Sequence, residues 1–491
     1  MGGAARPLHD PGNHRSVERG SNPHTARCGS LRRRAKPAGE RENDAALTPT
    51  SGARPPGRPS AGRVRVLTGA GMSAICTLAA GGRKLNRRPG RCSSTSCLPA
   101  WIWIVKRRGK IVVLHFAGQM PLAGVACQAL HYLLGLEQLG YEPWYIEDGG
   151  ANPYDPRANS VVMGCDYNVA YLRRIMEHYG FGARWAYWDA IQNICYGLPW
   201  DRIRSLYAEA AAVINLCGAT RLRDEHFACP IRIMIDTDPV YEQIKYAKAD
   251  QASRTYLDAH THFFTYGENL GTPDCSVPLC GVPWRPTRPP VDLRVWPGPR
   301  DSPSCFTTIG TWENKGKNIE FEGSQYVWSK HVNFMEFLDL PRYRPGTCFR
   351  MAMLPPDEHA RNAIEGRGWS LVDPRPISAD LSRYRDFIAH SGSEFTVAKD
   401  IYVRPNSGWF SDRSACYLAA SRPVVTMRTG FSKFYPVGRG LFEYTTHEEA
   451  LAAVDAISAD YSGHSRAARV IAEEYFAADR VLGALLASTG L

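Results

Sequence analysis

Residues 407–427, SGWFSDRSACYLAASRPVVTM, combine a glycine turn, a short helix pattern and a buried strand pattern. Ser411 or Asp412 can cap the helix, and Pro423 ends it before the β-branched residues 424–426. Backbone N–H groups at such a helix start, backed by the positive end of the helix dipole, suit a diphosphate. The pattern therefore predicts a helix–strand unit of an α/β fold with an anion-binding turn. A plain packing unit with a surface Arg413 is the alternative.

The first 110 residues differ in composition from the rest of the 491-residue chain. They hold 22 lysine and arginine residues but only 5 aspartate and glutamate residues, with little apolar periodicity. The remainder carries 37 basic and 43 acidic residues, so the formal net charge of +11 comes from this tail. We expect residues 1–109 to be disordered, and a translation start assigned too early would also produce such a segment. Its basic run lacks interleaved aromatic residues, so no specific nucleic-acid role is predicted.

Apolar runs and cysteines indicate the class of protein. The runs near residues 72–80 and 98–105 are shorter than the roughly 20 residues that a transmembrane helix needs. None of the 14 cysteines forms a CxxC pair, and Cys275 and Cys280 have no histidine at ligand spacing. We therefore expect a cytoplasmic protein with buried, reduced thiols and no transmembrane span.

The folded part is expected to begin at Lys110. Residues 111–116 form a continuous apolar run, as in a parallel strand buried on both faces. A helix pattern follows the loop 117–121, and a second strand pattern lies at residues 144–146. This β-α-β order predicts a Rossmann-like domain over residues 110–285. No GxGxxG motif occurs, which argues against an NAD-dependent dehydrogenase.

The proline-rich residues 286–303 predict a stiff linker to a second domain. Strand and helix patterns then alternate again, which predicts a second Rossmann-like domain over residues 304–491 with a terminal helix at 466–486. The expected fold class is α/β, with two Rossmann-like domains facing across a cleft and a disordered basic tail. Ligands of such sheets bind beyond the carboxyl ends of the strands.

A family resemblance arises at residues 419–425, AASRPVV, which are similar to the donor-binding part of GT-B glycosyltransferases. This class has two Rossmann-like domains and uses nucleotide-sugar donors. The preceding GWFSDR more closely resembles an uncharacterised bacterial branch of family 1/4-like members, akin to spore-coat-type enzymes. The resemblance departs from the family at Cys416, where a helix glutamate usually grips the donor ribose, because a thiol cannot accept two hydroxyl hydrogen bonds.

The resemblance implies that the second domain holds the donor and the first domain mainly holds the acceptor. Lys315 would neutralise charge on the leaving diphosphate, as would Lys317 in the same loop, although a solvated turn is the alternative. Arg413 is expected to contact the diphosphate, and its replacement by alanine to weaken donor binding without disturbing the fold. The implied donor-binding residues are Gly310, Thr311, Lys315, Ser407, Gly408, Ser411, Asp412, Arg413, Thr429 and Gly430.

An inverting transferase also needs a general base within reach of the acceptor hydroxyl. The candidates follow strand patterns of the first domain: His115, Asp236 and Glu268. No obvious nucleophile for a retaining mechanism is apparent, so both stereochemical outcomes stay open. The residues expected to contact the acceptor are Gly118, Gln119 and Asn269.

Residues 236–238, Asp-Thr-Asp, match the metal-binding signature of the GT-A class of glycosyltransferases. Pro239 follows directly and predicts a helix start with Asp238 as its N-cap. We therefore expect no obligatory metal and no cofactor apart from the nucleotide-sugar co-substrate.

The sequence thus predicts a glycosyltransferase that moves a sugar from a nucleotide diphosphate-sugar donor to an unknown acceptor. Two alternatives stay open, because one fold hosts many functions. A GT-B-fold nucleotide-sugar 2-epimerase would act on the same donor without an acceptor. A non-catalytic protein would bind the nucleotide-sugar and never release nucleotide.

Overall fold

The computed structural model of the protein describes residues 108–296, 298, 305–314 and 316–491. Residues 1–107 of the expected tail, and Lys315, lie outside the described residues. No helix in the described ranges has the length and apolar character needed to cross a membrane.

The first sheet has its neighbouring strands parallel, except for the antiparallel pair at one edge. Its central strands are fully buried on both faces, which is why they read as continuous apolar runs. In sheet order the strands are β10 (Trp284–Pro286), β9 (His262–Thr265), β8 (Arg232–Asp236), β7 (Ala210–Leu216), β1 (Lys110–Leu114), β2 (Glu142–Glu147), β5 (Trp185–Asp189) and β6 (Ile194–Gly197).

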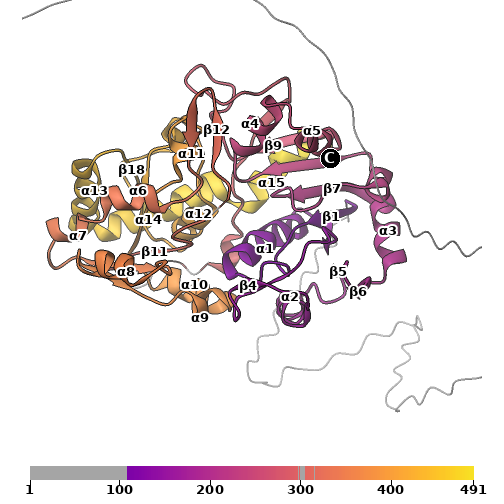
Figure 1. Ribbon diagram of the computed structural model, residues 1–491, viewed down its shortest axis with the longest axis horizontal. Coiled ribbons are helices and arrows are strands. Elements are labelled where there is room, and N and C mark those ends of the chain that lie inside the picture. Colours follow the sequence, from indigo (N-terminus) through magenta and orange to yellow (C-terminus); the bar gives the residue numbers. More distant parts are fainter. Residues whose placement is uncertain (1–107, 297, 299–304, 315) are drawn as a thin grey trace, which may run out of the picture. The chain divides into compact units, whose positions relative to one another are not determined.

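Helices and short turns connect these strands (Figure 1). The helices are α1 (Ala123–Gln138), α2 (Asp166–His178), α3 (Trp200–Glu209), α4 (Tyr241–Ala247) and α5 (Gln251–Asp258), with 3-10 turns η1 (Asp224–Ala228) and η2 (Leu293–Val295) and a hairpin of β3 (Tyr154–Asp155) and β4 (Ser160–Val161).

The second sheet is parallel throughout. Its strands, in sheet order, are β15 (Trp369–Leu371), β14 (Cys348–Ala352), β11 (Cys305–Ile309), β16 (Ser393–Thr396), β17 (Val424–Met427) and β18 (Leu441–Tyr444). Around it lie α6 (His331–Phe337), α7 (Leu340–Tyr343), α8 (Glu358–Glu365), α9 (Arg375–Ser378), α10 (Leu381–Ala389), α11 (Asp400–Val403), α12 (Asp412–Ala419), α13 (His447–Ala459), η3 (Phe431–Lys433) and the hairpin β12 (Ile319–Phe321) and β13 (Ser324–Tyr326). The predicted α/β class with two Rossmann-like sheets is confirmed.

The C-terminal segment returns to the first sheet's side of the molecule. Instead of the single helix expected at residues 466–486, the structure has α14 (Tyr461–Ile471), the π-helical turn η4 (Ala472–Phe476) and α15 (Ala478–Ala487). The helix breaks because Ala477 is extended and the Ala478 N–H group bonds to the Val291 carbonyl at 3.0 Å. In Figure 1 the yellow helix α15 lies against α1, and a Cβ atom at Gly135 would stand 2.7 Å from Leu482 Cδ1.

The cysteines are not all reduced thiols, contrary to expectation. Cys305 of β11 and Cys348 of β14 occupy paired positions on neighbouring strands and form a disulfide. The sequence gives no sign of this pair, because the two residues are 43 positions apart and meet only through strand pairing.

Candidate functional site

A pocket of about 720 Å³ lies where loops at the carboxyl ends of both sheets meet. The loops after β1, β7 and β8 contribute Phe116, Cys217 and Asp238 to its lining. The second sheet contributes the loop that follows β11 and the start of α12. This volume lies in the range of small-molecule sites, and its position beyond the strand ends is where open α/β sheets bind ligands.

Four of the residues expected to bind the donor line this pocket: Gly310, Thr311, Asp412 and Arg413. The first two follow β11, and the other two begin α12. Residues 310 and 413 are also direct neighbours, since a Cβ atom at Gly310 would stand 3.4 Å from Arg413 Nη1. The structure therefore brings these two sequence segments, about 100 positions apart, to one wall of the pocket.

Arg413 is held by the protein on three sides. Its Nε donates to Glu394 Oε1 at 2.6 Å, Nη1 donates to the Ile309 carbonyl at 2.8 Å, and Nη2 donates to Thr396 Oγ1 at 2.8 Å. Although burial opposes it, Glu394 holds the pKa of Arg413 above its ordinary value. The guanidinium thus ties the ends of β11 and β16 together while it lines the pocket.

A buried lysine that was not among the expected site residues, Lys330, lies near Arg413. Lys330 directly precedes α6, is 9% exposed, and has its Nζ 5.9 Å from the ring centre of the pocket-lining Trp409. Burial, and then the charge of Arg413, hold its pKa well below the ordinary value. Within the described residues no hydrogen bond or ion pair joins its amine to another side chain, and only the nearby charges of Glu394 and Asp412 oppose the lowering of its pKa. Only the position of a lysine before a helix pattern could have signalled it.

The start of α12 already holds an acidic group. Ser411 precedes the helix, but its side chain makes no capping hydrogen bond. The Arg413 N–H group donates to Asp412 Oδ1 at 2.9 Å, and Gln128 Nε2 donates to Asp412 Oδ2 at 3.3 Å. Burial raises the pKa of Asp412. A diphosphate bound here would therefore meet one carboxylate as well as the helix start.

Four other expected donor residues, Ser407, Gly408, Thr429 and Gly430, lie in a contact between the two domains and do not line the pocket. There Gly408 donates its N–H to the Thr429 carbonyl at 2.6 Å, and Asn269 donates its N–H to the Ser407 carbonyl at 3.1 Å. Gly408 has φ +77°, and a Cβ atom on it would stand 2.5 Å from Asn269 N, so only glycine fits this approach. Gly430, with φ +95°, faces Asn406 in the same contact.

The loop after β1 holds the expected acceptor residues Gly118 and Gln119, which do not line the pocket. Their N–H groups both donate to the buried carboxylate of Glu147, to which Tyr145 also donates. Burial raises the pKa of Glu147 to about 7. Glu147 therefore fixes the shape of this loop, which begins directly after the pocket-lining Phe116.

His115 reaches the pocket through one intermediate residue. It is buried, and its Nε2 lies 3.1 Å from Oε1 of Gln128, which lines the pocket. Cys217 also donates to this oxygen, at 2.9 Å. Burial lowers the pKa of His115 to about 4, so the imidazole is neutral at pH 7. Nδ1 of the ring is buried without a hydrogen bond.

The other two candidate catalytic carboxylates, Asp236 and Glu268, do not line the pocket. Asp236 accepts from Gln243 Nε2 at 2.7 Å and from Thr265 Oγ1 at 3.1 Å. Glu268 accepts a bidentate pair of hydrogen bonds from Arg288 at 3.0–3.2 Å, and also accepts from Tyr435 of the second domain. Burial raises the pKa of both acids, that of Asp236 to about 7.

Replacing Asp236 with asparagine is expected to stabilise the protein more at high pH than at low pH. A carboxyl group whose pKa rises on folding, here from 3.8 to about 7, disfavours the native state once it ionises. This cost grows as pH rises from the pKa of Asp236 in the unfolded chain to its pKa in the folded protein, and it is constant at higher pH. The stability gain of the variant should therefore increase by about 3 kcal/mol between pH 5 and pH 8, measured by urea unfolding. The exposed Asp201→Asn is the control, and an equal gain at both pH values would contradict the expectation.

Asp238 is not the N-cap that the sequence predicted. The helix α4 begins later, after Val240, whose N–H bonds to Gln243 Oε1 at 2.7 Å and whose φ is +85°. That backbone conformation is costly for a β-branched residue and turns the chain sharply beside the pocket. Asp238 is thereby free to pair with Lys399 of the second domain, with Nζ and Oδ1 2.9 Å apart. Desolvation would raise the pKa of Asp238, but Lys399 and Tyr402 lower it.

Two side-chain groups in the described ranges have the composition of a metal site. One consists of Asp148, Glu225 and His226, and the other of Cys127, His131 and Cys416. None of these six residues lines the pocket. In the first group the Asp148 carboxylate is already bonded to His226, Tyr207 and Arg223 at 2.7–3.0 Å, so it forms a satisfied buried network.

No protein-family model matches this chain, and no curated protein matches it. Solved structures with similarity include an α-glucosyltransferase (AGT) in complex with UDP, with 10% identity and a TM-score of 0.47 over 78% of this chain and 100% of that chain. HepE of Anabaena, in complex with UDP and glucose, has 9% identity and a TM-score of 0.44 over 77% and 100%. AviGT4, a glycosyltransferase involved in avilamycin A biosynthesis, has 13% identity and a TM-score of 0.42 over 77% and 96%.

The narrower resemblance to spore-coat-type enzymes stays a prediction. The fold itself follows from the strand order of the two sheets and from the pocket that their carboxyl ends share. With two Rossmann-like domains arranged around this pocket, the described part of the chain has the GT-B fold.

Proposed function

We propose that this protein is a glycosyltransferase that moves a sugar from a nucleotide diphosphate-sugar to an acceptor. The observation that carries the proposal is the shared pocket together with Lys330, a buried lysine whose Nζ lies 5.9 Å from the ring centre of the pocket-lining Trp409. A buried ammonium is costly unless an anion binds there. A diphosphate supplies that anion, and the pocket has room for the attached nucleoside or sugar. The GT-B-type donors implied by the sequence resemblance carry such a group.

In the proposed reaction, the acceptor hydroxyl oxygen attacks the anomeric carbon as the bond from this carbon to the diphosphate breaks. Negative charge then builds on the leaving diphosphate. Lys330 and the N–H groups at the start of α12 are the groups that would stabilise this charge, and Arg413, in the first turn of α12, lines the pocket beside them. Stabilisation of this kind acts most strongly where water is excluded.

For the proton of the acceptor hydroxyl we retain His115 as the candidate base. Its imidazole is neutral, and because Nε2 must donate to Gln128 Oε1, the nitrogen left to accept a proton is Nδ1, which makes no hydrogen bond. Asp236 and Glu268 are held by internal hydrogen bonds and do not line the pocket, which makes them weaker candidates. The expectation that no metal is obligatory stays part of the proposal.

The proposal is tested by a thermal-shift panel of nucleoside diphosphates and nucleotide-sugars on the full chain. A ligand that binds the native state raises the midpoint of unfolding by mass action, by an amount set by its dissociation constant. We expect a shift that is selective for one nucleotide and that the matching nucleoside monophosphate does not reproduce, because the diphosphate makes the main contact. No shift from any diphosphate would contradict the proposal.

Turnover then separates the three functions. Release of nucleoside diphosphate that requires an acceptor supports a transferase, and His115→Gln should abolish this release without changing donor binding. Conversion of the nucleotide-sugar without any acceptor would indicate the epimerase. Binding without any turnover across an acceptor panel would indicate the non-catalytic protein.

A further inference from the structure

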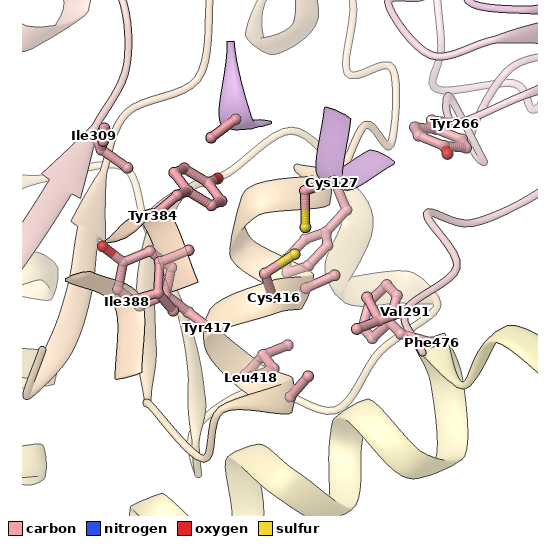
Figure 2. Close-up of a cluster of buried hydrophobic side chains, with 14 of the residues drawn as sticks. Cys127, Tyr266, Val291, Ile309, Tyr384, Ile388, Cys416, Tyr417, Leu418 and Phe476 are labelled. Atoms are coloured by element: carbon pink, nitrogen blue, oxygen red, sulfur yellow. The ribbon is translucent and has the colours of Figure 1, made fainter. Parts of the chain in front are cut away.

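A buried pair of free cysteines, one from each domain, lies next to the pocket. Cys127 belongs to α1 and is 2% exposed, and Cys416 belongs to α12 and is 4% exposed. Figure 2 shows their sulfur atoms turned toward each other within a cluster of apolar side chains. The two sulfurs and a ring nitrogen of His131 all lie within 4.8 Å of one another.

The surroundings of His131 argue against a metal ion in this group. The Asp292 N–H group donates to His131 Nδ1 at 3.0 Å, and Trp296 Nε1 lies 3.2 Å from His131 Nε2. Because Nδ1 accepts the Asp292 N–H, a neutral ring carries its proton on Nε2, the nitrogen that lies 3.3 Å from Cys127 Sγ and 3.7 Å from Cys416 Sγ. A metal-binding histidine instead offers an unprotonated nitrogen to the ion and donates the other N–H to an oxygen. The two thiols are left as the reactive groups of the cluster.

The environment of the two thiols also makes them unequal. The hydrogen bond from Cys416, and then His131 beside it, hold the pKa of Cys127 well below its ordinary value although burial raises it. Burial raises the pKa of Cys416 instead. Cys127 therefore has the character of an attacking thiolate and Cys416 that of the thiol that resolves the product.

We propose that Cys127 and Cys416 form a reversible disulfide, and that this modification site locks the two domains together at the pocket. With hydrogen peroxide as oxidant, the Cys127 sulfur attacks one peroxide oxygen and the O–O bond breaks. One water molecule is released, and Cys127 becomes a sulfenic acid. The Cys416 sulfur then attacks the Cys127 sulfur, the S–O bond breaks, and a second water leaves. The two thiols are oxidised by two electrons and peroxide is reduced to two waters. A small dithiol reverses the step by exchange.

The position of this bond gives it a consequence for the pocket. Gln128, which lines the pocket, is the next residue after Cys127, and Arg413 lies one helical turn before Cys416. A covalent link between α1 and α12 would fix the spacing of these two walls. If the proposed function holds, the opening and closing needed for donor entry and nucleotide release would be restricted. This consequence rests on the proposed function, whereas formation of the bond does not.

Peptide mapping of the full chain after peroxide treatment tests the bond directly. Trypsin releases Cys127 on residues 111–157 and Cys416 on residues 414–428, since the bond between Arg422 and Pro423 resists cleavage. Each of these peptides contains a single cysteine, so a linked species two hydrogens lighter than their sum identifies the disulfide. We expect this species in the oxidised protein, its loss on treatment with dithiothreitol, and its absence from Cys416→Ser.

The control variant is Cys229→Ser, which removes a buried thiol bonded to backbone carbonyls and should leave the linked species unchanged. Absence of the linked peptide from wild-type protein in which the exposed Cys280 has been oxidised would overturn the proposal. Stoichiometric zinc in the purified protein, lost in Cys416→Ser, would also overturn it. Because this readout needs no nucleotide, it fails or succeeds independently of the donor-binding panel. If both succeed, nucleotide release should be slowed by oxidation in wild type and not in Cys416→Ser.

Discussion

Replacing Arg413 with alanine is expected to lower the free energy of unfolding by about 3–5 kcal/mol. The reason is Glu394, which is 0% exposed and whose Oε1 receives the Arg413 Nε at 2.6 Å. Its second oxygen is already buried without a hydrogen bond. Removing the guanidinium leaves an uncompensated carboxylate between β11 and β16, and also removes the donors to Ile309 and Thr396. Urea unfolding followed by tryptophan fluorescence measures the change.

Two further variants make this expectation specific. Arg404→Ala breaks an ion pair with Asp400 in which the arginine side chain is 45% exposed, and should cost less than about 1 kcal/mol. The double variant Arg413→Met, Glu394→Leu removes both buried charges and should recover most of the loss, since apolar residues can replace a buried pair. A loss below about 1 kcal/mol for Arg413→Ala would contradict the role given to Glu394. The sequence alone suggested the opposite, an arginine whose removal leaves the fold intact, because Glu394 is near Arg413 only after β16 and α12 have packed.

The fold could be predicted because its signals are local. Apolar runs at residues 111–116 and 424–426 mark strands buried on both faces, and Pro423 marks the boundary between helix and strand. The antiparallel edge strand β6 was missed, because its residues are largely exposed and carry no apolar run. The break before α15 was missed as well, since it depends on a hydrogen bond to Val291, nearly 190 residues earlier.

The site was only partly predictable, for the same physical reason. Gly310 follows the strand β11, and Asp412 begins the helix α12. Both line the pocket, as residues at the carboxyl ends of strands and at the helix starts beside them do. Ser407, Gly408 and Thr429 are close to that helix in sequence, yet they pack between the domains. Which side of a loop faces a cleft is decided by contacts with the other domain, and no single segment carries that information.

Replacing Lys330 with methionine is expected to weaken nucleoside diphosphate binding by about 10–100-fold, the worth of one or two charge-assisted contacts. Methionine keeps most of the volume and removes the charge, so the variant should fold with equal or greater stability. Burial and Arg413 lower the pKa of Lys330, and a bound diphosphate would raise it again. Binding should therefore take up a proton, and wild-type affinity should fall as pH rises while the affinity of the variant does not.

Titration calorimetry at several pH values, in buffers of different ionisation enthalpy, measures both the affinity and the proton uptake. Lys248→Met is the matched control, because Lys248 is exposed and bonds to the Glu320 carbonyl. It should leave affinity and proton uptake unchanged. If Lys330→Met instead retained wild-type affinity and the same proton uptake, the diphosphate would have to bind elsewhere, and the buried ammonium would need another anion. The two variants therefore decide whether Lys330 is the reason that the pocket binds a nucleotide.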